Sequence, residues 1–323
     1  MILHEFPDLA WLKCQITQGF TNRQGWKGLV LNTTGFPSVI IHTNVRECYR
    51  PDIKGPLSLF LNLRGTSYCQ VEGETRRIGE GYYCISNCSQ LYTLQIERGE
   101  PVETFNIHFG ETFGEEVLSA LLTRTDQVLD NGPEYSPIPF GFFNGLQRRD
   151  AVMDQLIRQI ALAYQEQGFD PLLFEQQLTD LLAHLLQQHR QVLATIHRLP
   201  PVRSSTRTEL YRRLSRARDY IHSTPIGTCS LDDLAAAACL SKYHFLRLFR
   251  LTYGVSPHQY IQQQRLERAQ QLLTRTPISI SDLSDALGFA NSQSFSRLFT
   301  QQMGISPSRY RERSSAKIAT LVK

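Results

Sequence analysis

Two stretches near the C-terminus carry side chains that can hydrogen-bond to another molecule, and the sequences of the two stretches match each other. Phe245–Tyr260 and Phe295–Tyr310 share Phe, Arg, Leu, Phe, Gly, Ser, Pro and Tyr in register, so eight of sixteen positions are identical at an offset of 50 residues. This agreement indicates a duplicated structural unit. Both copies hold an arginine at the same place, Arg247 and Arg297. Arginine is the side chain that most often reads guanine in the major groove of DNA.

The element that must position each arginine is a helix that follows a tight turn. In the first copy, Leu231–Ala238 leads through a short turn into a helix whose expected N-cap is Ser241. In the second, Ile280–Leu287 leads through a turn that contains Gly288. Two helices joined by about three residues, with a small residue in the turn, predict a helix-turn-helix.

Helical spacing separates the buried face of each second helix from its outward face. In the first copy, the residues expected in the core are Leu240, Phe245, Leu248 and Phe249. The outward set there is Lys242, Tyr243, Leu246, Arg247 and Arg250, and in the second copy it is Ser292, Gln293, Ser296, Arg297 and Thr300. Arg pairs with guanine and Gln with adenine, so we expect these faces to contact DNA, although any single residue could be an idle surface residue. Leu246 could contact a thymine methyl or its own domain.

The charge distribution agrees with a polyanionic partner for one half of the chain. Residues 1–200 contain 16 Lys and Arg against 22 Asp and Glu, whereas residues 201–323 contain 18 against 8. Neutralising phosphates releases counterions and gives affinity without sequence choice. A basic face that is merely solvated is the alternative. The arginines Arg212, Arg213 and Arg216 allow the same two interpretations, phosphate contact or solvated helix charge.

The first 200 residues read as two different regions. Residues 9–110 are predicted to be β-rich, with short apolar runs such as Leu57–Leu63 between turn residues. Residues 149–199 show helical periodicity, and the second of two apolar stripes is Leu178, Leu181, Leu182, Leu185, Leu186, Val192 and Ile196. That stripe could form a dimer seam or pack on its own β domain. Residues 201–207 are expected to be a linker, 208–313 a second domain and 314–323 a tail.

Composition predicts a soluble protein of two domains in the cytoplasm. No apolar run approaches the roughly 18 residues of a membrane helix, and the start of the chain lacks the pattern of a signal peptide. Seven cysteines are an odd number scattered along the chain, so we expect reduced thiols. Cys84 and Cys88 could form a redox or metal switch, or be inert.

Residues 208–312 resemble the AraC/XylS family of transcription regulators. The resemblance rests on the double motif, on the joining segment Pro257–Leu273 and on Gly288–Arg297 followed by Gly304–Tyr310. It departs from the family at Ser284, where Ala is usual, and at Cys239, where Gly is common. The resemblance implies an α+β protein with two helix-turn-helix units, whose reading helices enter successive major grooves of promoter DNA. It also implies an activator, with RNA polymerase as a further partner.

For the N-terminal half, the resemblance implies a cupin-like β-barrel that senses a small-molecule effector, followed by helices that form a homodimer. Arg64, Tyr68, Tyr82, Tyr83 and His108 are the expected effector-binding residues, although plain core or surface positions are the alternative. Histidines in the β region are isolated, so we expect no metal, no cofactor and no catalytic residues. A metal cupin enzyme or a cysteine-based DNA alkyl-transfer protein is the alternative function.

Overall fold

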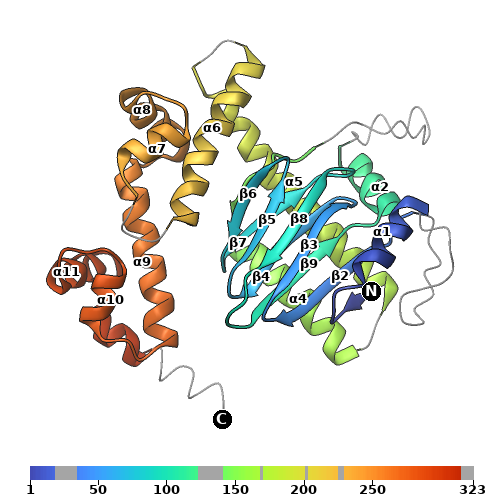
Figure 1. Ribbon diagram of the computed structural model, residues 1–323, viewed down its shortest axis with the longest axis horizontal. Coiled ribbons are helices and arrows are strands. Elements are labelled where there is room, and N and C mark those ends of the chain that lie inside the picture. The colour runs from blue at the N-terminus through green and yellow to red at the C-terminus, as the bar shows by residue number, and fades with distance from the viewer. Residues whose placement is uncertain (19–34, 123–140, 168–169, 201–202, 225–228, 314–323) are drawn as a thin grey trace. The chain divides into compact units, whose positions relative to one another are not determined.

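The computed structural model describes residues 1–18, 35–122, 141–167, 170–200, 203–224 and 229–313. It divides into two compact units, Met1–Thr195 and Ile196–Lys323, each of which is described by itself (Figure 1). In this part of the chain no helix is long and apolar enough to cross a membrane.

The N-terminal unit contains two β-sheets (Figure 1). The six-stranded sheet has the order β1 (Ile2–Leu3), β2 (Val39–Val45), β9 (Val102–His108), β4 (Ser58–Arg64), β7 (Tyr82–Ser86) and β10 (Gln147–Arg148). The four-stranded sheet has the order β3 (Cys48–Lys54), β8 (Leu91–Ile96), β5 (Ser67–Val71) and β6 (Glu74–Ile78). Among the described residues no ladder joins one sheet to the other, so the strands do not form the closed barrel that the family resemblance implies. The β-rich character is confirmed.

Strand β9 is buried on both faces, and its two faces differ in chemistry. Phe105 and Ile107 belong to an apolar cluster on the outer side of the six-stranded sheet. Thr104, Asn106 and His108 alternate with them and are also buried. The cluster between the sheets combines residues of both, among them Ile41, Phe60 and Leu94. Polar side chains therefore reach the space between the two sheets.

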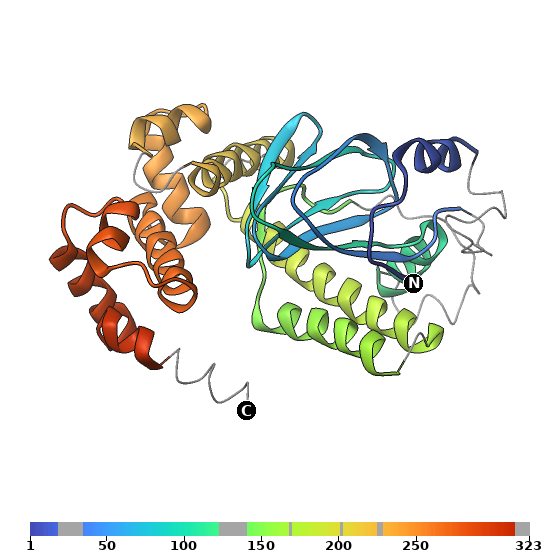
Figure 2. The ribbon, with the colours of Figure 1, turned by 60° about the horizontal axis from the view of Figure 1, so that its bottom comes forward.

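Two helices cover the outer face of the six-stranded sheet, namely α4 (Ala151–Gln167) and α5 (Pro171–His197) (Figure 2). The residues of the apolar stripe of α5 that enter this core are Leu178, Leu181, Leu182, Leu185 and Leu186. Burying one such side chain contributes roughly 1.5–3 kcal/mol. Of the two alternatives for this stripe, the structure therefore shows packing of α5 on its own β unit.

Two further helices of this unit flank the strands, α1 (Leu9–Gln18) and α2 (Glu111–Leu122). Helix α1 corrects the prediction that β structure begins at residue 9. Asp8 Oδ1 accepts a hydrogen bond from the backbone N of Trp11 at 2.8 Å, which is the geometry of an N-cap. The cap is a local sequence signal for a helix, and the run that follows contains mostly good helix formers, namely Leu, Ala, Lys and Gln.

The C-terminal unit is helical throughout its described length. Its helices are α6 (Ser204–Ser223), α7 (Leu231–Ala237), α8 (Lys242–Tyr253), α9 (Pro257–Arg275), α10 (Ile280–Ala286) and α11 (Ser292–Met303). Helix α6 begins inside the range 201–207 that was expected to be a linker, because Ser204–Arg207 already form its first turn. Helices α7 and α8 lie near one end of α9, and α10 and α11 near the other (Figure 1).

Candidate functional site

The two predicted helix-turn-helix units are α7 with α8 and α10 with α11. Ser241 caps α8 by accepting from the backbone N of His244, and Asn291 caps α11 by accepting from that of Ser294. Gly254 and Gly304 end the two helices in the left-handed conformation, with φ of 76° and 74°. Both reading helices therefore begin and end in the same way.

The turns between the paired helices differ in length by one residue. Cys239 and Gly288 occupy the matching place in the two turns, both with positive φ, 50° and 70°. They are 49 residues apart, whereas Phe245 and Phe295 are 50 apart, so the second turn contains one extra residue. A left-handed conformation suits glycine and costs other residues roughly 1–2 kcal/mol. Glycine at position 239 would hold this conformation without that cost.

Helix α8 presents the expected face to solvent. Phe245 and Phe249 are fully buried, whereas Tyr243 is 74% and Leu246 39% exposed. The exposed residues of this face are Lys242, Tyr243, Leu246, Arg247 and Arg250. Lys242 pairs with Asp232 of α7, and because both side chains are well exposed this pair contributes little stability. In the described residues Arg247 and Arg250 have no ion pair or hydrogen bond, so their guanidinium groups can accept an anionic or base-edge partner.

Helix α11 presents a less charged face. Gln293, Arg297 and Thr300 are exposed, and Ser292 and Ser296 are partly exposed. Thr300 Oγ1 donates to the carbonyl of Ser296 at 2.7 Å, so its proton is used within the helix. Arg297 is the one cation of this face.

Each reading helix packs through a phenylalanine pair onto a supporting helix. Phe295 and Phe299 contact the C-terminal half of α9 in a cluster that includes Leu266, Ala269 and Leu273. In the first unit, Phe249 meets Tyr253 and Tyr260 with ring centroids 4.6 and 5.6 Å apart. The first helix-turn-helix unit, α7 with α8, also packs against α6. Helix α9 thus supports both reading helices within one compact unit.

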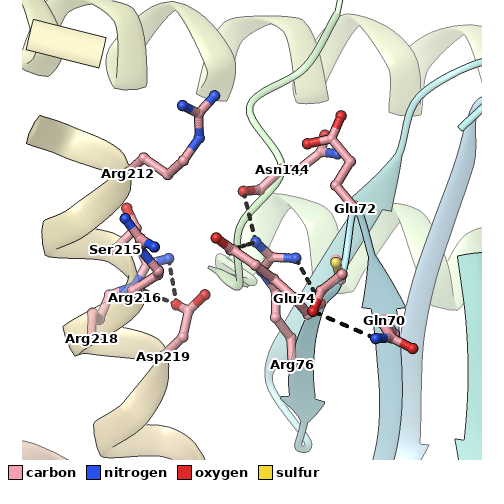
Figure 3. Close-up of polar contacts among 12 residues, drawn as sticks. Gln70, Glu72, Glu74, Arg76, Asn144, Arg212, Ser215, Arg216, Arg218 and Asp219 are labelled. Atoms are coloured by element: carbon pink, nitrogen blue, oxygen red, sulfur yellow. Dashed lines mark hydrogen bonds and ion pairs between the residues drawn. The ribbon is translucent and has the colours of Figure 1, made fainter. Parts of the chain in front are cut away.

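Helix α6 contacts α8 beside an ion pair of its own, Arg218 with Asp219. Arg218 donates to Asp219 Oδ1 from Nε at 3.2 Å and Nη2 at 3.0 Å (Figure 3). Its guanidinium lies 5.6 Å from the Tyr253 ring centroid, and Ser215 bonds the Tyr253 hydroxyl at 3.4 Å. Burial raises the pKa of Tyr253, so its phenol stays neutral. The contacts of Arg218 and Ser215 with Tyr253 hold α6 against the C-terminal end of α8.

The arginines that sequence analysis singled out on α6 share one acidic partner. Glu209 lies within 2.9 Å of Arg212, 3.0 Å of Arg213 and 3.5 Å of Arg216. The hydrogen bond from Arg213, followed by that from Arg212, lowers the pKa of the Glu209 carboxyl. One carboxylate cannot neutralise both Arg212 and Arg213, so this face of α6 keeps positive charge.

The cysteines that were candidates for a switch occupy different environments. Cys84 is buried and Cys88 is exposed, and all cysteines of the described chain are free thiols. The thiol close to Cys84 is that of Cys69 on strand β5, and this contact together with burial raises the pKa of Cys69. Among the described residues no group of three or more His, Cys, Asp or Glu is placed to hold a metal ion.

A cavity lies in the N-terminal unit between the two sheets, α1 and the first residues of the chain. Apolar side chains make most of its wall, including Trp11, Leu12, Phe36, Ile41, Phe60 and Leu94. The polar residues that line it are Arg50, Tyr92, Asn106 and His108. Of the five effector residues expected from sequence, His108 alone lines this cavity. Tyr83 belongs to the core under α4 and α5, Arg64 is exposed, and Tyr68 and Tyr82 are half-buried elsewhere.

His108 is held as a neutral imidazole of defined tautomer. The Ser58 hydroxyl donates to the carbonyl of Pro56 at 2.9 Å, so at 2.8 Å it must accept from His108 Nδ1. Burial, and then the charge of Arg50, lowers the pKa of His108 to about 4. The second ring nitrogen, Nε2, is therefore unprotonated and can accept a hydrogen bond.

Two polar groups at this cavity have no partner within the described residues. Arg50 is 9% exposed and its Nη2 has no hydrogen bond, and Asn106 is 2% exposed with Nδ2 equally unsatisfied. An unsatisfied buried donor costs about 1–3 kcal/mol, and more if it is charged. Such groups in a native core call for an explanation.

Sequence reasoning missed Arg50 and Asn106. The alternation Thr104, Asn106, His108 in an otherwise apolar strand is a signal that could have revealed Asn106. Arg50 reaches the interior because the β3–β8 register shifts between Arg50 and Ile53, where Asp52 has a φ of 51°. The irregularity lets Arg50 and Ile53 both face inward, although an odd spacing would place them on opposite faces of a regular strand.

Comparisons with known proteins agree with the geometry of the C-terminal unit. A protein-family model described as a helix-turn-helix domain matches residues 234–313. The MmsAB operon regulatory protein of Pseudomonas aeruginosa is 34% identical over 124 residues, 38% of this chain and 39% of that protein. The HTH-type transcriptional activator RhaR of Escherichia coli is 34% identical over 136 residues, 42% of this chain and 45% of that protein. The chain thus spans less than half the length of these curated relatives.

One solved structure covers the same kind of domain. A transcriptional regulator of Chromobacterium violaceum, described as containing an AraC-type DNA-binding domain, is 31% identical in sequence. The match covers 32% of this chain and 92% of that chain, with a TM-score of 0.31. By the matched family model and the identities to these curated regulators, the C-terminal unit is a helix-turn-helix domain of the AraC/XylS type.

Proposed function

We propose that this protein is a sequence-specific DNA-binding transcription regulator, an activator that responds to a small-molecule effector. The observation that carries the proposal is the pair of equally built reading helices. Each has an outward arginine at the same position, Arg247 or Arg297, with no ion pair in the described part of the chain. The relatives named as operon regulator and transcriptional activator support it.

In this proposal α8 and α11 enter successive major grooves on one side of the duplex. The base- or phosphate-contacting residues are Lys242, Tyr243, Leu246, Arg247 and Arg250 from α8, and Ser292, Gln293, Ser296 and Arg297 from α11. Arg247 and Arg297 read guanine and Gln293 reads adenine, whereas Lys242 and Arg250 contact phosphates. The arginines on α6 add to the phosphate-binding charge.

In this proposal the two halves of the chain have separate roles. Residues 1–200 form the sensing half, a cupin-like domain opened into two sheets, and residues 208–313 form the DNA-binding half. We assign the protein to the cytoplasm as a homodimer, with RNA polymerase as the partner in activation. The proposal includes no catalytic step, metal or cofactor, because the relatives are named as regulators.

The test is selection of binding sequences from random duplexes by the full chain, followed by gel-shift measurement against a scrambled duplex. The expected result is a preferred sequence bound at least 1,000-fold more tightly than the scrambled duplex, as is typical of specific binders. Affinity should also fall steeply with salt, because binding releases counterions. Equal affinity for all duplexes, or no binding by folded protein, would overturn the proposal.

A further inference from the structure

The cavity of the N-terminal unit combines an apolar wall with a cation that has no ion pair among the described residues, and this pair of features defines the chemistry of a ligand. The cavity measures about 50 Å³. A single buried water needs roughly 10–15 Å³, so the cavity is larger than the space of one water. Its walls are aliphatic and aromatic, contributed by both sheets and by α1.

The cation is Arg50, and the groups that the structure describes around it leave its charge unpaired. Asp8 is the carboxylate that acts on it through space, but Asp8 is exposed, and its Oδ1 is occupied as the N-cap of α1 at 2.8 Å from the backbone N of Trp11. Cys48 and Tyr92 also face Arg50, but burial raises the pKa of both, so both remain neutral. The Phe6 ring lies 5.4 Å from the guanidinium carbon and cannot accept a directed pair of hydrogen bonds. No described residue makes an ion pair with Arg50.

The polar groups nearby set the charge and shape of the partner. Asn106 offers a second buried donor at the same cavity, and His108 offers a neutral ring whose Nε2 is unprotonated. A guanidinium has a planar fork that matches a carboxylate. One cation balances one negative charge, and a dianion would bring an unbalanced charge into an apolar site at high cost.

We propose that this cavity binds a small monocarboxylate with an apolar body, whose carboxylate pairs with Arg50 and accepts from Asn106 while the body fills the apolar wall. This inference rests on the proposed function, since it names the chemical class of the effector of that regulator. It assigns the effector to Arg50 and Asn106 with His108, in place of the tyrosines chosen by residue type.

The test measures binding to the full chain by calorimetry and by thermal unfolding. Benzoate and hexanoate are compared with the neutral isosteres benzamide and 1-hexanol and with the dianion phenyl phosphate. We expect the carboxylates to bind and to raise the unfolding temperature, and the neutral and dianionic compounds to bind at least tenfold more weakly. Equal binding of acid and neutral isostere, tighter binding of phenyl phosphate, or no binding of either acid would overturn the proposal.

The variant Arg50→Met separates recognition from folding. It should weaken carboxylate binding ten- to a hundredfold, as loss of a charge-assisted hydrogen bond does. It should also raise the unfolding temperature of the ligand-free protein, because it removes an unsatisfied buried charge. The matched control is Arg98→Met, an arginine of the same unit whose side chain is 90% exposed, and it should change neither quantity. Undiminished carboxylate binding by Arg50→Met would contradict the assignment, and Asn106→Leu gives a second check if Arg50→Met fails to fold.

The same samples are assayed for selective DNA binding without ligand. Selective DNA binding by a protein that ignores carboxylates would overturn the ligand inference and leave the proposed function standing. Carboxylate binding by a protein with no DNA preference would overturn the proposed function and leave the assignment of a carboxylate to the cavity standing.

Discussion

The two helix-turn-helix units share a scaffold and differ in the face that they present. Every residue of the outward set of α8 has its counterpart 50 positions later on α11, and in each pair except Arg247 and Arg297 the residue changes. Lys242 becomes Ser292, Tyr243 becomes Gln293, Leu246 becomes Ser296 and Arg250 becomes Thr300. The buried phenylalanines and the left-handed glycines at the helix ends stay the same. Packing thus constrains the inner face of a repeated unit, and the outer face is free to specialise.

This difference suggests a division of labour within the proposed function. The first face holds three cations and the second holds one. Phosphate contacts supply affinity and salt dependence, whereas hydrogen bonds to base edges supply sequence choice. We therefore expect the first helix-turn-helix unit to contribute more of the electrostatic affinity. In the second unit, base contacts by Arg297 and Gln293 should make up a larger fraction of the binding.

The largest expected effect comes from removing the scaffold of one unit. Phe295→Ala deletes a fully buried ring of α11 and should lower the free energy of unfolding by about 3–5 kcal/mol. Loss of the second half of the DNA site should follow, and Phe245→Ala should do the same to the first half. Urea unfolding and footprinting measure the two effects. Tyr243→Ala, which removes a 74% exposed ring, is the control and should change stability by no more than about 0.5 kcal/mol. An equal loss of unfolding free energy in Phe295→Ala and in Tyr243→Ala would contradict the assignment of Phe295 to the core.

The paired arginines test whether both units read bases. Arg247→Ala and Arg297→Ala should each weaken binding to the preferred duplex by about 1–3 kcal/mol and relax the preference at one base pair. Gel shifts with a set of single-base variants of the duplex measure this. A uniform loss on every sequence would make the arginine concerned a phosphate contact.

The turns offer a smaller and purely structural comparison. Cys239 holds a left-handed conformation that Gly288 holds without strain. Cys239→Gly should therefore raise the free energy of unfolding by about 1 kcal/mol, and Gly288→Ala should lower it by roughly 1–2 kcal/mol. Chemical denaturation of the two variants gives both numbers. A destabilised Cys239→Gly variant would show that the cysteine side chain has a contact that offsets the strain.

The smallest effect concerns charge. Arg250→Ala should reduce the slope of log affinity against log salt by about 1, whereas Thr300→Ala at the matching place on α11 should leave it unchanged. Titration of DNA binding over a range of salt concentrations separates them. An unchanged slope for Arg250→Ala would remove Arg250 from the phosphate contacts.

The sequence was most informative where periodicity decides the structure. The inner face of each reading helix followed from helical spacing, as with Phe245 and Phe249, and the repeat predicted the second unit from the first. The helical range 149–199 followed in the same way from its apolar stripes. Local periodicity needs no knowledge of distant residues, so these predictions required only the chain itself.

The cavity depends on relations that the sequence does not display. Arg50 reaches it because an irregularity at Asp52 shifts the register of β3 against β8. Tyr83 was expected to bind the effector, but pleating directs it to the core beneath α4 and α5. The closed barrel expected from family resemblance is replaced by two sheets whose edges are not joined within the described residues. Each of these features is set by which strands pair, a long-range property.

Methylation interference on the preferred duplex tests most directly whether the two matched helices read one DNA site. The wild-type full chain should show two groups of sensitive guanines about one helical turn apart, roughly 10–10.5 base pairs. Arg247→Ala should abolish the interference at one group only and Arg297→Ala at the other only. A single sensitive group, or loss of the same group in both variants, would contradict the account.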